Sequence, residues 1–515
     1  MESHPKKRKA MEEEDRLSRL PDDLLHSILH GLQLKHAART SALSRRWSRL
    51  WLRALAASSV IDFTDRDFAR GQSAARAAAT VSRCLQLHAE NGAPLDVFRV
   101  ALDVTLGCDG AFERDVVGWV AFALGRGRAR EVEVDLTPAH RNRAQQLDAD
   151  QDGATFMELP GDVFLTENSL ARLSLDRFSL RAVTPGAPGL AGLRSLSLSR
   201  ADVTDEAVQA VVSSCRLLEF LSLSSCHLLT SVRISGDNLQ RLELVRCPAV
   251  QELRVAAPAL ESFVFHGDVV DLYDWESEEV VGVDMGATPV LRDAYLSHIG
   301  FGTADDVDIK EYAYFDFMSR VAHAPTLTLC SVGMRHIRAQ LNYDDLMEID
   351  MTNIEELQLL MASLDEDDLE ALFSFLQLNP ITILDRLFIR LPIDAAEASG
   401  VAAPPIHEAQ GSFIADYVDN LVLDHLRLIK VVNFRGTRCE LVMISFLLKK
   451  APALEQLVLV AVEEERGASG DELLKIIQGK VSAMQKASPE VRVTVCRPSE
   501  DRSQNPAHTR FYHEE

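Results

Sequence analysis

The residues best suited to chemistry in this 515-residue chain are cysteines, histidines and clustered carboxylates. Cys215, Cys226 and Cys247 lie 11 and 21 residues apart, whereas structural zinc favours closely paired ligands. His407-Glu408 is not part of an H-E-x-x-H zinc motif. The run 365–368 is acidic throughout and is typical of a solvated helix start rather than of a general acid–base pair. The sequence therefore predicts no metal site and no catalytic residue.

The sequence also lacks the motifs that bind nucleotides or activate a serine. The chain has no G-x-x-x-x-G-K-S/T loop, and Gly125-Arg126-Gly127-Arg128 lacks the third glycine of a dinucleotide-binding fingerprint. The nucleophile elbow G-x-S-x-G is absent as well. We therefore expect no cofactor and no enzymatic activity.

The composition sets further limits on the class of protein. The net charge is -23, which argues against a general nucleic-acid binder because affinity for phosphate depends on Lys and Arg. The acidic surplus suits either basic partners or solubility alone. Eight cysteines without a C-x-x-C pair do not make a disulfide framework, and no apolar run reaches the roughly 18 residues of a membrane helix. We expect an intracellular protein without nucleic acid or membrane as partners.

The elements that could position a binding surface are internal repeats. An L-x-x-L-x-L triplet recurs at intervals of 21 to 25 residues, the last time with Phe at two of its positions. Period and triplet are typical of leucine-rich repeats, in which each unit adds one short strand and stacked units share a core. Cys226 and Cys247 hold the Asn/Cys position that faces the interior. The five triplets begin at Leu170, Leu193, Leu218, Leu239 and Leu260.

Weaker copies extend the array in both directions. Triplets begin at Ile354, Leu384 and Leu454, and degenerate strands begin near Leu95 and Val132. Residues 204–212 fit a helical return segment with Thr204 as its cap. The sequence thus predicts an α/β fold, a short three-helix module (17–56) followed by an irregular leucine-rich-repeat solenoid (95–420), with spacers at 141–153, 271–284 and 395–410. Residues 1–16 and 497–515 are expected to be disordered tails.

The first tail contains a basic cluster, Lys6, Lys7, Arg8 and Lys9, directly after a proline. Such a cluster in a flexible segment predicts a nuclear import signal. A solvated charged tail is the alternative interpretation. We expect the protein in the nucleus, and a cytoplasmic population stays open.

Residues 17–56 form an amphipathic helical module. Apolar residues recur at i, i+1, i+4, i+5 and i+8 from Leu24, which defines one helix face, and Ser44 is placed to cap a helix carrying Trp47 and Trp51. A unit this small rarely buries enough surface to fold alone. Its apolar face is expected to meet a partner, or else the module only seals the following domain.

The motifs L-P-x-x-L-L-x-x-I-L from Leu20 and R-T-S-A-L-S-R-R-W-x-x-L-W from Arg39 resemble the F-box of plant F-box/leucine-rich-repeat proteins. The resemblance implies docking to a Skp-type adaptor and through it to a cullin. His36 departs from the family, which often has an acidic residue there. The residues implied to form or support the docking face are Leu20, Pro21, Leu24, Leu25, Ile28, Leu29, Leu43, Trp47, Leu50 and Trp51.

Residues 421–496 resemble the FBD segment at the carboxyl end of many plant F-box proteins. They are expected to form a strand over 425–436, a turn at Gly436, an amphipathic helix and a second strand. The segment could equally be the terminal repeat that caps the array, and we expect capping as its role.

In a repeat strand, alternate side chains point to the concave face. From this row we expect contacts with a target protein, so that the chain would be the substrate-recognition subunit of an SCF-type (cullin-RING) ubiquitin ligase without a catalytic residue of its own. The alternative is a nuclear leucine-rich-repeat scaffold or regulator without ligase output. The candidate target-binding residues are Arg172, Asp176, Phe220, Arg241, Glu243 and His266.

Overall fold

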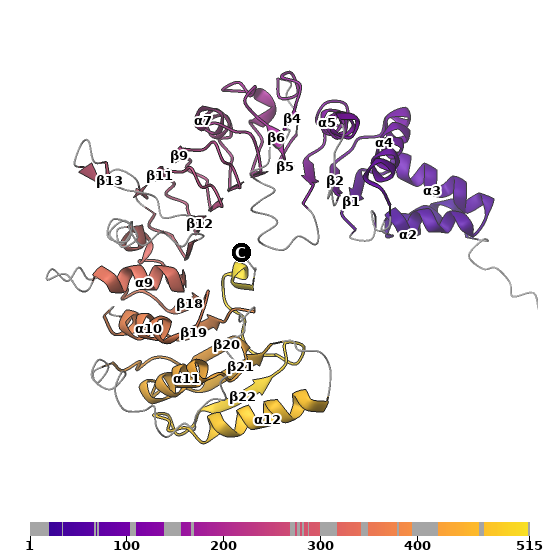
Figure 1. Ribbon diagram of the computed structural model, residues 1–515. Coiled ribbons are helices and arrows are strands. Elements are labelled where there is room, and N and C mark those ends of the chain that lie inside the picture. Colours follow the sequence, from indigo (N-terminus) through magenta and orange to yellow (C-terminus); the bar gives the residue numbers. More distant parts are fainter. Residues whose placement is uncertain are drawn as a thin grey trace, which may run out of the picture. The chain divides into compact units, whose positions relative to one another are not determined.

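The structure is a computed structural model (Figure 1). It describes residues 20–32, 34–65, 68, 72–102, 110–137, 156–165, 169–267, 273–274, 279–280, 283–286, 288–298, 317–340, 349–378, 381–393, 421–462 and 468–512. The chain divides into two compact units: unit 1 comprises residues 1–141 and 157–176, and unit 2 comprises residues 142–156 and 177–515.

Unit 1 begins with the predicted helical module and continues directly into parallel strands. The module contains α1 (Asp22–His30), α2 (Leu34–Arg39), the 3-10 helix η2 (Thr40–Ala42) and α3 (Arg45–Ala57). It is followed by β1 (Val60–Phe63), α4 (Ala74–Asn91), β2 (Val97–Ala101), α5 (Gly110–Leu124), β3 (Glu131–Asp135), β4 (Met157–Glu158) and β5 (Arg172–Asp176).

The strands predicted near residues 95 and 132 are confirmed as β2 and β3. Strands β1, β2, β3 and β5 pair in parallel in that order. Alternate residues of each strand are buried, as Phe98 and Val100 in β2 and Val132 and Val134 in β3 show. The ladder therefore starts at Val60, earlier than the predicted boundary at residue 95, because β1 lacks the triplet that marks the later strands.

Unit 2 contains most of the repeats. Its first half consists of β6 (Phe178–Ser179), η3 (Pro188–Leu190), β7 (Ser195–Ser199), α7 (Asp205–Ser214), β8 (Phe220–Ser224), β9 (Ser231–Ser235), β10 (Arg241–Val245), β11 (Glu252–Ala256), β12 (Ser262–Gly267), β13 (Tyr273–Asp274), β14 (Glu279–Val280) and β15 (Val283–Asp284). Its second half consists of β16 (Asp293–His298), β17 (Thr326–Cys330), α9 (Ser331–Gln340), β18 (Glu356–Leu360), α10 (Glu366–Leu378), β19 (Arg386–Arg390), β20 (Leu428–Phe434), α11 (Arg438–Lys450), β21 (Gln456–Ala461), α12 (Ala468–Ser482), β22 (Arg492–Cys496) and η5 (Thr509–Tyr512).

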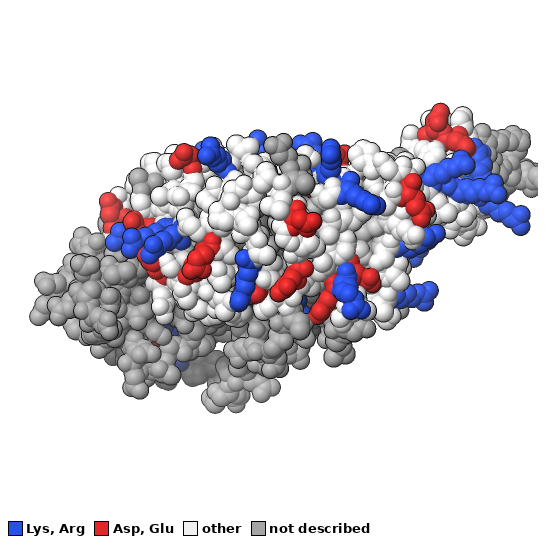
Figure 2. Space-filling model, turned by 90° about the horizontal axis from the view of Figure 1, so that it is seen from above, with Lys and Arg blue, Asp and Glu red and all other residues white. Residues whose placement is uncertain are grey.

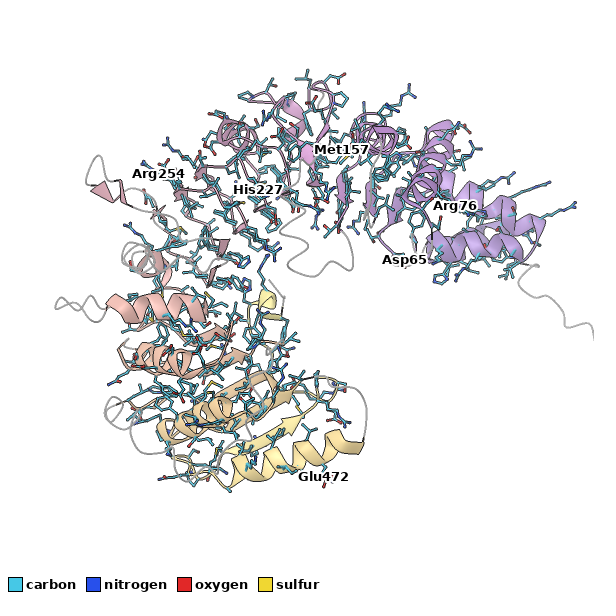
Figure 3. All side chains as sticks on the ribbon, viewed as in Figure 1. Asp65, Arg76, Met157, His227, Arg254 and Glu472 are labelled. Carbon is cyan, nitrogen blue, oxygen red and sulfur yellow. The ribbon has the colours of Figure 1, made fainter. Side chains whose placement is uncertain are left out.

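One parallel ladder runs through unit 2 in the order β7, β8, β10, β12, β16, β17, β18, β19, β20, β21, β22. The triplet leucines of these strands are almost completely buried, for example Leu221, Leu242 and Leu357. Within unit 2 the strands follow a curve, with the return helices on its outer side (Figure 1). Figure 3 shows Arg254 and Glu472 on that outer side, away from the inner row of strands. The predicted repeat architecture is confirmed.

Two local predictions about the repeats are also confirmed. Thr204 caps α7, since its Oγ1 accepts a hydrogen bond from the Ala207 N–H at 3.4 Å. Cys226 and Cys247 are buried, and their thiols donate to backbone carbonyls of the strands, that of Cys247 to Leu223 at 3.6 Å. The Asn/Cys position therefore satisfies the turn backbone inside the repeat.

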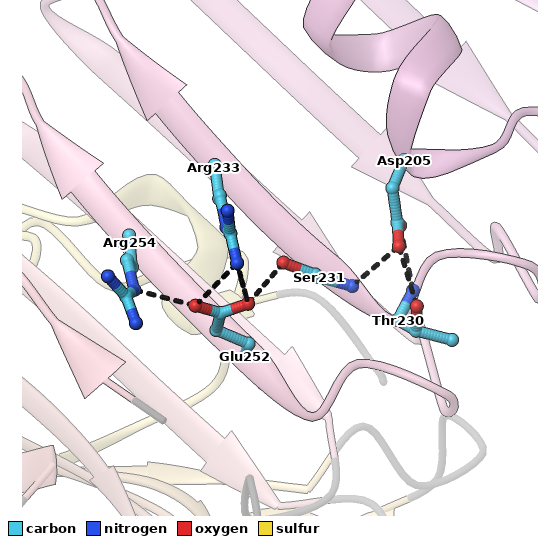
Figure 4. A network of polar contacts seen from close by, with 6 residues as sticks. All are labelled: Asp205, Thr230, Ser231, Arg233, Glu252 and Arg254. Atoms are coloured by element: carbon cyan, nitrogen blue, oxygen red, sulfur yellow. Dashed lines mark hydrogen bonds and ion pairs between the residues drawn. The ribbon is translucent and has the colours of Figure 1, made fainter. Parts of the chain in front are cut away.

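A second, smaller sheet lies on the return side of three repeats. Strands β9, β11 and β15 pair in parallel, and Asp205 at the start of α7 accepts hydrogen bonds from Thr230 N, Thr230 Oγ1 and Ser231 N at 2.9, 2.6 and 3.0 Å (Figure 4). The Asp205 carboxylate also faces the positive end of its own helix. It therefore joins one return helix to the next repeat.

The substitution Asp205→Ala is expected to lower the free energy of unfolding by about 1–2 kcal/mol, because it leaves donors of the next repeat without their charged acceptor. Glu206→Ala is the matched control: Glu206 is also in the first turn of α7 but is exposed, so its loss is expected to cost no more than about 0.5 kcal/mol. Urea unfolding followed by circular dichroism measures both. Equal losses for the two variants would contradict the role of Asp205.

The carboxyl-terminal repeats match the predicted strand, turn, helix and strand. They appear as β20, a turn at Gly436 with φ of +79°, α11 and β21. A capping box starts α11, with Thr437 and Glu440 each bonded to the other's backbone. Beyond the prediction, α12 and β22 add one further unit, and β22 pairs with β21.

The expectation of a disordered tail after residue 496 is wrong for residues 497–512, which the structure describes. We call Arg497–Tyr512 the C-terminal segment. It lies on the inner side of the strands of unit 2 (Figure 1), and its Phe511 is completely buried. The prediction rested on the polar composition of the tail. A few charged residues and one aromatic ring nevertheless hold the segment on the sheet.

Other predictions concern residues outside those described. They include the basic cluster at 6–9, the tail 1–16, residues 141–153 and the loop 395–410. Among the described helices none is long and apolar enough to span a membrane. On the face shown in Figure 2, acidic and basic side chains are interspersed over the described surface and do not gather in one basic field.

Candidate functional site

The helical module of unit 1 closes around a small apolar core. The contributing side chains come from α1, α2 and α3 and are Leu25, Leu29, Ala37, Trp47, Leu50 and Ala54. Leu20 and Trp51 pack against the edge of this cluster. These members of the predicted docking set therefore support the module from inside.

The other predicted docking residues are exposed. Leu24 and Ile28, one turn apart on α1, have 52% and 40% of their surface exposed, and Leu43 before α3 has 63%. Pro21, at the start of α1, is exposed as well. Leu32, which the resemblance does not include, is 38% exposed and continues the α1 row at i+8. Exposed apolar side chains on so small a module make it a candidate interaction surface.

The start of α1 is held against α3 by an arginine. Arg46 Nη2 lies 2.5 Å from Asp22 Oδ1 and donates to the Leu20 carbonyl at 2.7 Å. Arg46 also donates to the Asp22 carboxylate, and this hydrogen bond holds the pKa of Asp22 below its usual value. Ser44 caps α3 as predicted, since its Oγ accepts from the Trp47 N–H. The exposed row of α1 is thus fixed in orientation relative to α3.

Of the predicted target-binding residues in unit 2, three lie together on the inner face. Phe220 and Arg241 are register neighbours, and the Arg241 guanidinium carbon is 5.0 Å from the centre of the Phe220 ring. Glu243, two residues along β10, accepts a hydrogen bond from Ser222 Oγ at 3.1 Å. Phe220, Arg241 and Glu243 therefore form one small patch at the start of the unit 2 ladder.

Asp176 and His266 differ from the rest of the predicted set because both are buried. In unit 1, Asp176 accepts a hydrogen bond from the Leu136 N–H at 2.9 Å, while Arg172 is exposed. In unit 2, His266 is 1% exposed. Both follow directly after the last apolar residue of their triplets, where the chain turns into the return segment. Both positions still lie within their strands, β5 and β12, but both side chains are buried, so neither is presented to a partner.

The contact of the C-terminal segment with this face was not predicted from the sequence. Arg510 Nη1 lies 3.4 Å from Glu243 Oε2, so one predicted target-binding residue already contacts the chain itself. The only available signal was the apolar middle residues of the central strands, Val264, Tyr295 and Phe388, because a solvent-facing row is not expected to be apolar.

Cys84 and Cys215 are poor candidates for nucleophiles. Burial raises the pKa of Cys215 to about 12 and that of Cys84 to about 11, so both are protonated at neutral pH. Within the described part of the chain, no group of three His, Cys, Asp or Glu is placed to hold a metal ion.

Comparison with known proteins agrees with both parts of the chain. Residues 17–54 match the F-box domain, and residues 157–495 match the family described as At1g61320/AtMIF1, LRR domain. F-box domains generally bind Skp-type adaptors, and leucine-rich repeats bind targets.

Relatives from Arabidopsis thaliana carry the same domain names. F-box protein At5g03100 is 28% identical over 47% of this chain and 67% of its own length. F-box/FBD/LRR-repeat protein At1g13570 is 24% identical over 91% of this chain and 96% of its own. F-box/LRR-repeat protein At3g03360 is 27% identical over 47% of this chain and 46% of its own. The chain belongs to the family of F-box proteins with a leucine-rich-repeat domain of the At1g61320/AtMIF1 type.

Proposed function

We propose that the chain is the substrate-recognition subunit of an SCF-type (cullin-RING) ubiquitin ligase and has no catalytic residue. The observation that supports this most is the division of the helical module into an apolar core and apolar side chains left outside it. Leu24 and Ile28 on α1 and Leu43 before α3 are exposed, and none of them belongs to the core. Such exposed side chains fit the Skp-type adaptor that F-box domains generally bind.

The mechanism would be proximity. The adaptor would link the module to a cullin, and the repeats would hold a target protein while a conjugating enzyme recruited elsewhere transfers ubiquitin to it. On the target side we propose the patch of Phe220, Arg241 and Glu243, because aromatic and arginine side chains dominate protein–protein contacts. Capture of a target unchanged by Arg241→Glu would exclude this patch.

Assembly tests the adaptor side first. Coexpression of the full chain with a Skp-type adaptor and a cullin amino-terminal domain is expected to yield one complex on gel filtration. Replacing exposed Leu43 by Asp should remove the complex. Replacing exposed Leu165 by Asp is the control, since this leucine of unit 1 is 53% exposed but lies outside the helical module. Loss with both variants, or with neither, would contradict the proposal. An intact complex without ubiquitin transfer would instead favour a scaffold without ligase output.

We also propose that the basic cluster Lys6, Lys7, Arg8 and Lys9 directs the protein to the nucleus. Four adjacent cations after a proline are suited to an import receptor. A fluorescent fusion of the full chain should accumulate in nuclei, and the same fusion with all four residues changed to Ala should spread into the cytoplasm. An unchanged distribution would remove this assignment.

A further inference from the structure

The middle residues of the unit 2 strands form one row on the inner face, and most of them are buried. Parallel register places them side by side in the order Glu243, Val264, Tyr295, Thr328, Gln358, Phe388 and Lys430. From Val264 to Lys430 each is 1% exposed or less. Repeat arrays usually leave this face open for partners. Here the C-terminal segment crosses it.

The first half of the segment is held by a buried lysine. Lys430 Nζ is 2.6 Å from Asp501 Oδ2 and donates to Gln504 O and Asn505 Oδ1 at 3.2 and 3.3 Å. Lys430 is 0% exposed, so these contacts form away from bulk water. Burial opposes ionisation of Asp501, but the hydrogen bonds from Lys430 and Ser503 hold its pKa below the usual value. A buried cation on β20 thus binds a carboxylate and two amide oxygens.

The second half meets carboxylates on β18, β16 and β10. The Ala507 N–H donates to Glu356 Oε1 at 2.6 Å, and His508 Nε2 lies 3.4 Å from Asp293 Oδ1. Arg510 reaches Glu243 at 3.4 Å. The segment therefore crosses the strands from β20 towards β10, with its anionic end at a cation of the sheet and its cationic end at anions of the sheet. This charge pattern fixes the direction of the chain.

Phe511 anchors the end of the segment. Its side chain is completely buried in an apolar cluster with Tyr295, Leu360 and Phe388, and its ring centre is 6.2 Å from that of Phe388. Its carbonyl accepts a hydrogen bond from Arg390 Nη1 at 2.8 Å. A single aromatic side chain buried in an apolar cluster beside charge pairs is the kind of anchor that dominates protein–protein contacts.

Contacts within the sheet already orient the groups that receive the segment. Glu356 accepts from Arg386 Nε at 2.8 Å and from Gln358 Nε2 at 2.6 Å, and Asp293 accepts from Ser262 Oγ at 2.6 Å. The described contacts of the segment with the strands run through side chains or single backbone groups. By contrast, β22 joins the sheet through continuous register with β21. Residues of the sheet itself thus hold Glu356 and Asp293 in place, and the segment is attached as a ligand is.

We propose that the strip from Glu243 to Lys430 is a peptide-binding site whose resident ligand is the C-terminal segment of the same chain. The site takes a peptide that carries a carboxylate and, on a short helical turn at its end, a cation followed by a phenylalanine, spaced as Asp501, Arg510 and Phe511 are. The inference rests on the proposed function, because it means that a target protein reaches this strip only by displacing the segment.

A peptide of residues 497–515 labelled at its amino end tests the site by fluorescence anisotropy. The full chain with Asp501→Asn and Phe511→Ala in its own segment is expected to bind the peptide at least tenfold more tightly than wild type. Adding Lys430→Met to that variant should cancel the gain. Ser499→Ala, at an exposed position of the segment, should behave as wild type. If the double variant bound the peptide no more tightly than wild type, the segment would be a fixed part of the fold, and the proposal would be overturned.

Hydrogen exchange of the unaltered chain tests the proposal without a variant that could misfold. Amides of residues 497–512 should exchange at least tenfold faster than those of β18, β19 and β20, because the segment opens while the repeats stay folded. Exchange at the same rate would overturn the proposal. Adaptor binding measured on the same samples should not change in either test, so failure here is distinct from failure of the proposed function.

Discussion

Aspartate in place of both Leu24 and Ile28 is expected to weaken binding of a Skp-type adaptor at least 100-fold, a loss of about 2.7 kcal/mol or more. Both side chains are exposed on α1, and charged groups there would have to be desolvated without a partner when an apolar interface forms. The free energy of unfolding should stay within about 0.5 kcal/mol of wild type, because neither side chain belongs to the core. Titration calorimetry and urea unfolding provide the two readings.

Leu25→Ala is the matched control, because Leu25 adjoins Leu24 but is 0% exposed. It should destabilise the module by about 2–5 kcal/mol through the cavity it leaves, and lose adaptor binding only as the module unfolds. If Leu24→Asp/Ile28→Asp lost stability as Leu25→Ala does, the exposed row would be part of the core, and the division of the module into core and surface would be wrong.

The second large effect is expected at the ion pair beneath the C-terminal segment. Asp501→Ala removes the carboxylate partner of Lys430, whose ammonium is fully buried. An unpaired buried charge is costly, so the free energy needed to open the segment should fall by about 3 kcal/mol, more than 100-fold in amide protection. Hydrogen exchange of residues 497–512 measures this quantity.

Lys430→Met combined with Asp501→Ala is expected to recover most of that loss, because an apolar side chain replaces the unpaired ammonium beside Phe388 and Val458 of the apolar cluster. A double variant as poorly protected as Asp501→Ala alone would show that the ion pair has little part in holding the segment. The coupling between the two sites therefore separates a charge effect from a loss of packing.

The repeat strands could be predicted because each is marked by a triplet of apolar residues within its own short sequence. Leu242 and Leu244, for example, point to the same side of β10, and the same spacing recurs in β8 and β12. In β16 Ala294 replaces the second leucine of the triplet, and in β1 Ser58 replaces the first, so neither strand carries the complete triplet. Only their pairing with neighbouring strands shows that they belong to the ladder.

The sites were predicted less completely, for a physical reason. Leu24 and Leu25 are consecutive leucines of one helix, and only the position of α3 decides that one is exposed and the other buried. The contacts of the C-terminal segment join residues far apart in the chain, as Asp501 with Lys430 and Arg510 with Glu243. Periodicity reports on neighbours along the chain, so it could not reveal these pairs.

Reconstituted ubiquitin transfer is the most direct test of the central claim, that this chain links an adaptor to a target through separate surfaces. Purified chain, Skp-type adaptor, cullin–RING core, activating enzyme and conjugating enzyme are incubated with ubiquitin, and modification of the chain and of captured proteins is followed. The account predicts transfer with the intact chain and none with Leu24→Asp/Ile28→Asp. Equal transfer with both chains, or none with either despite an assembled complex, would contradict it.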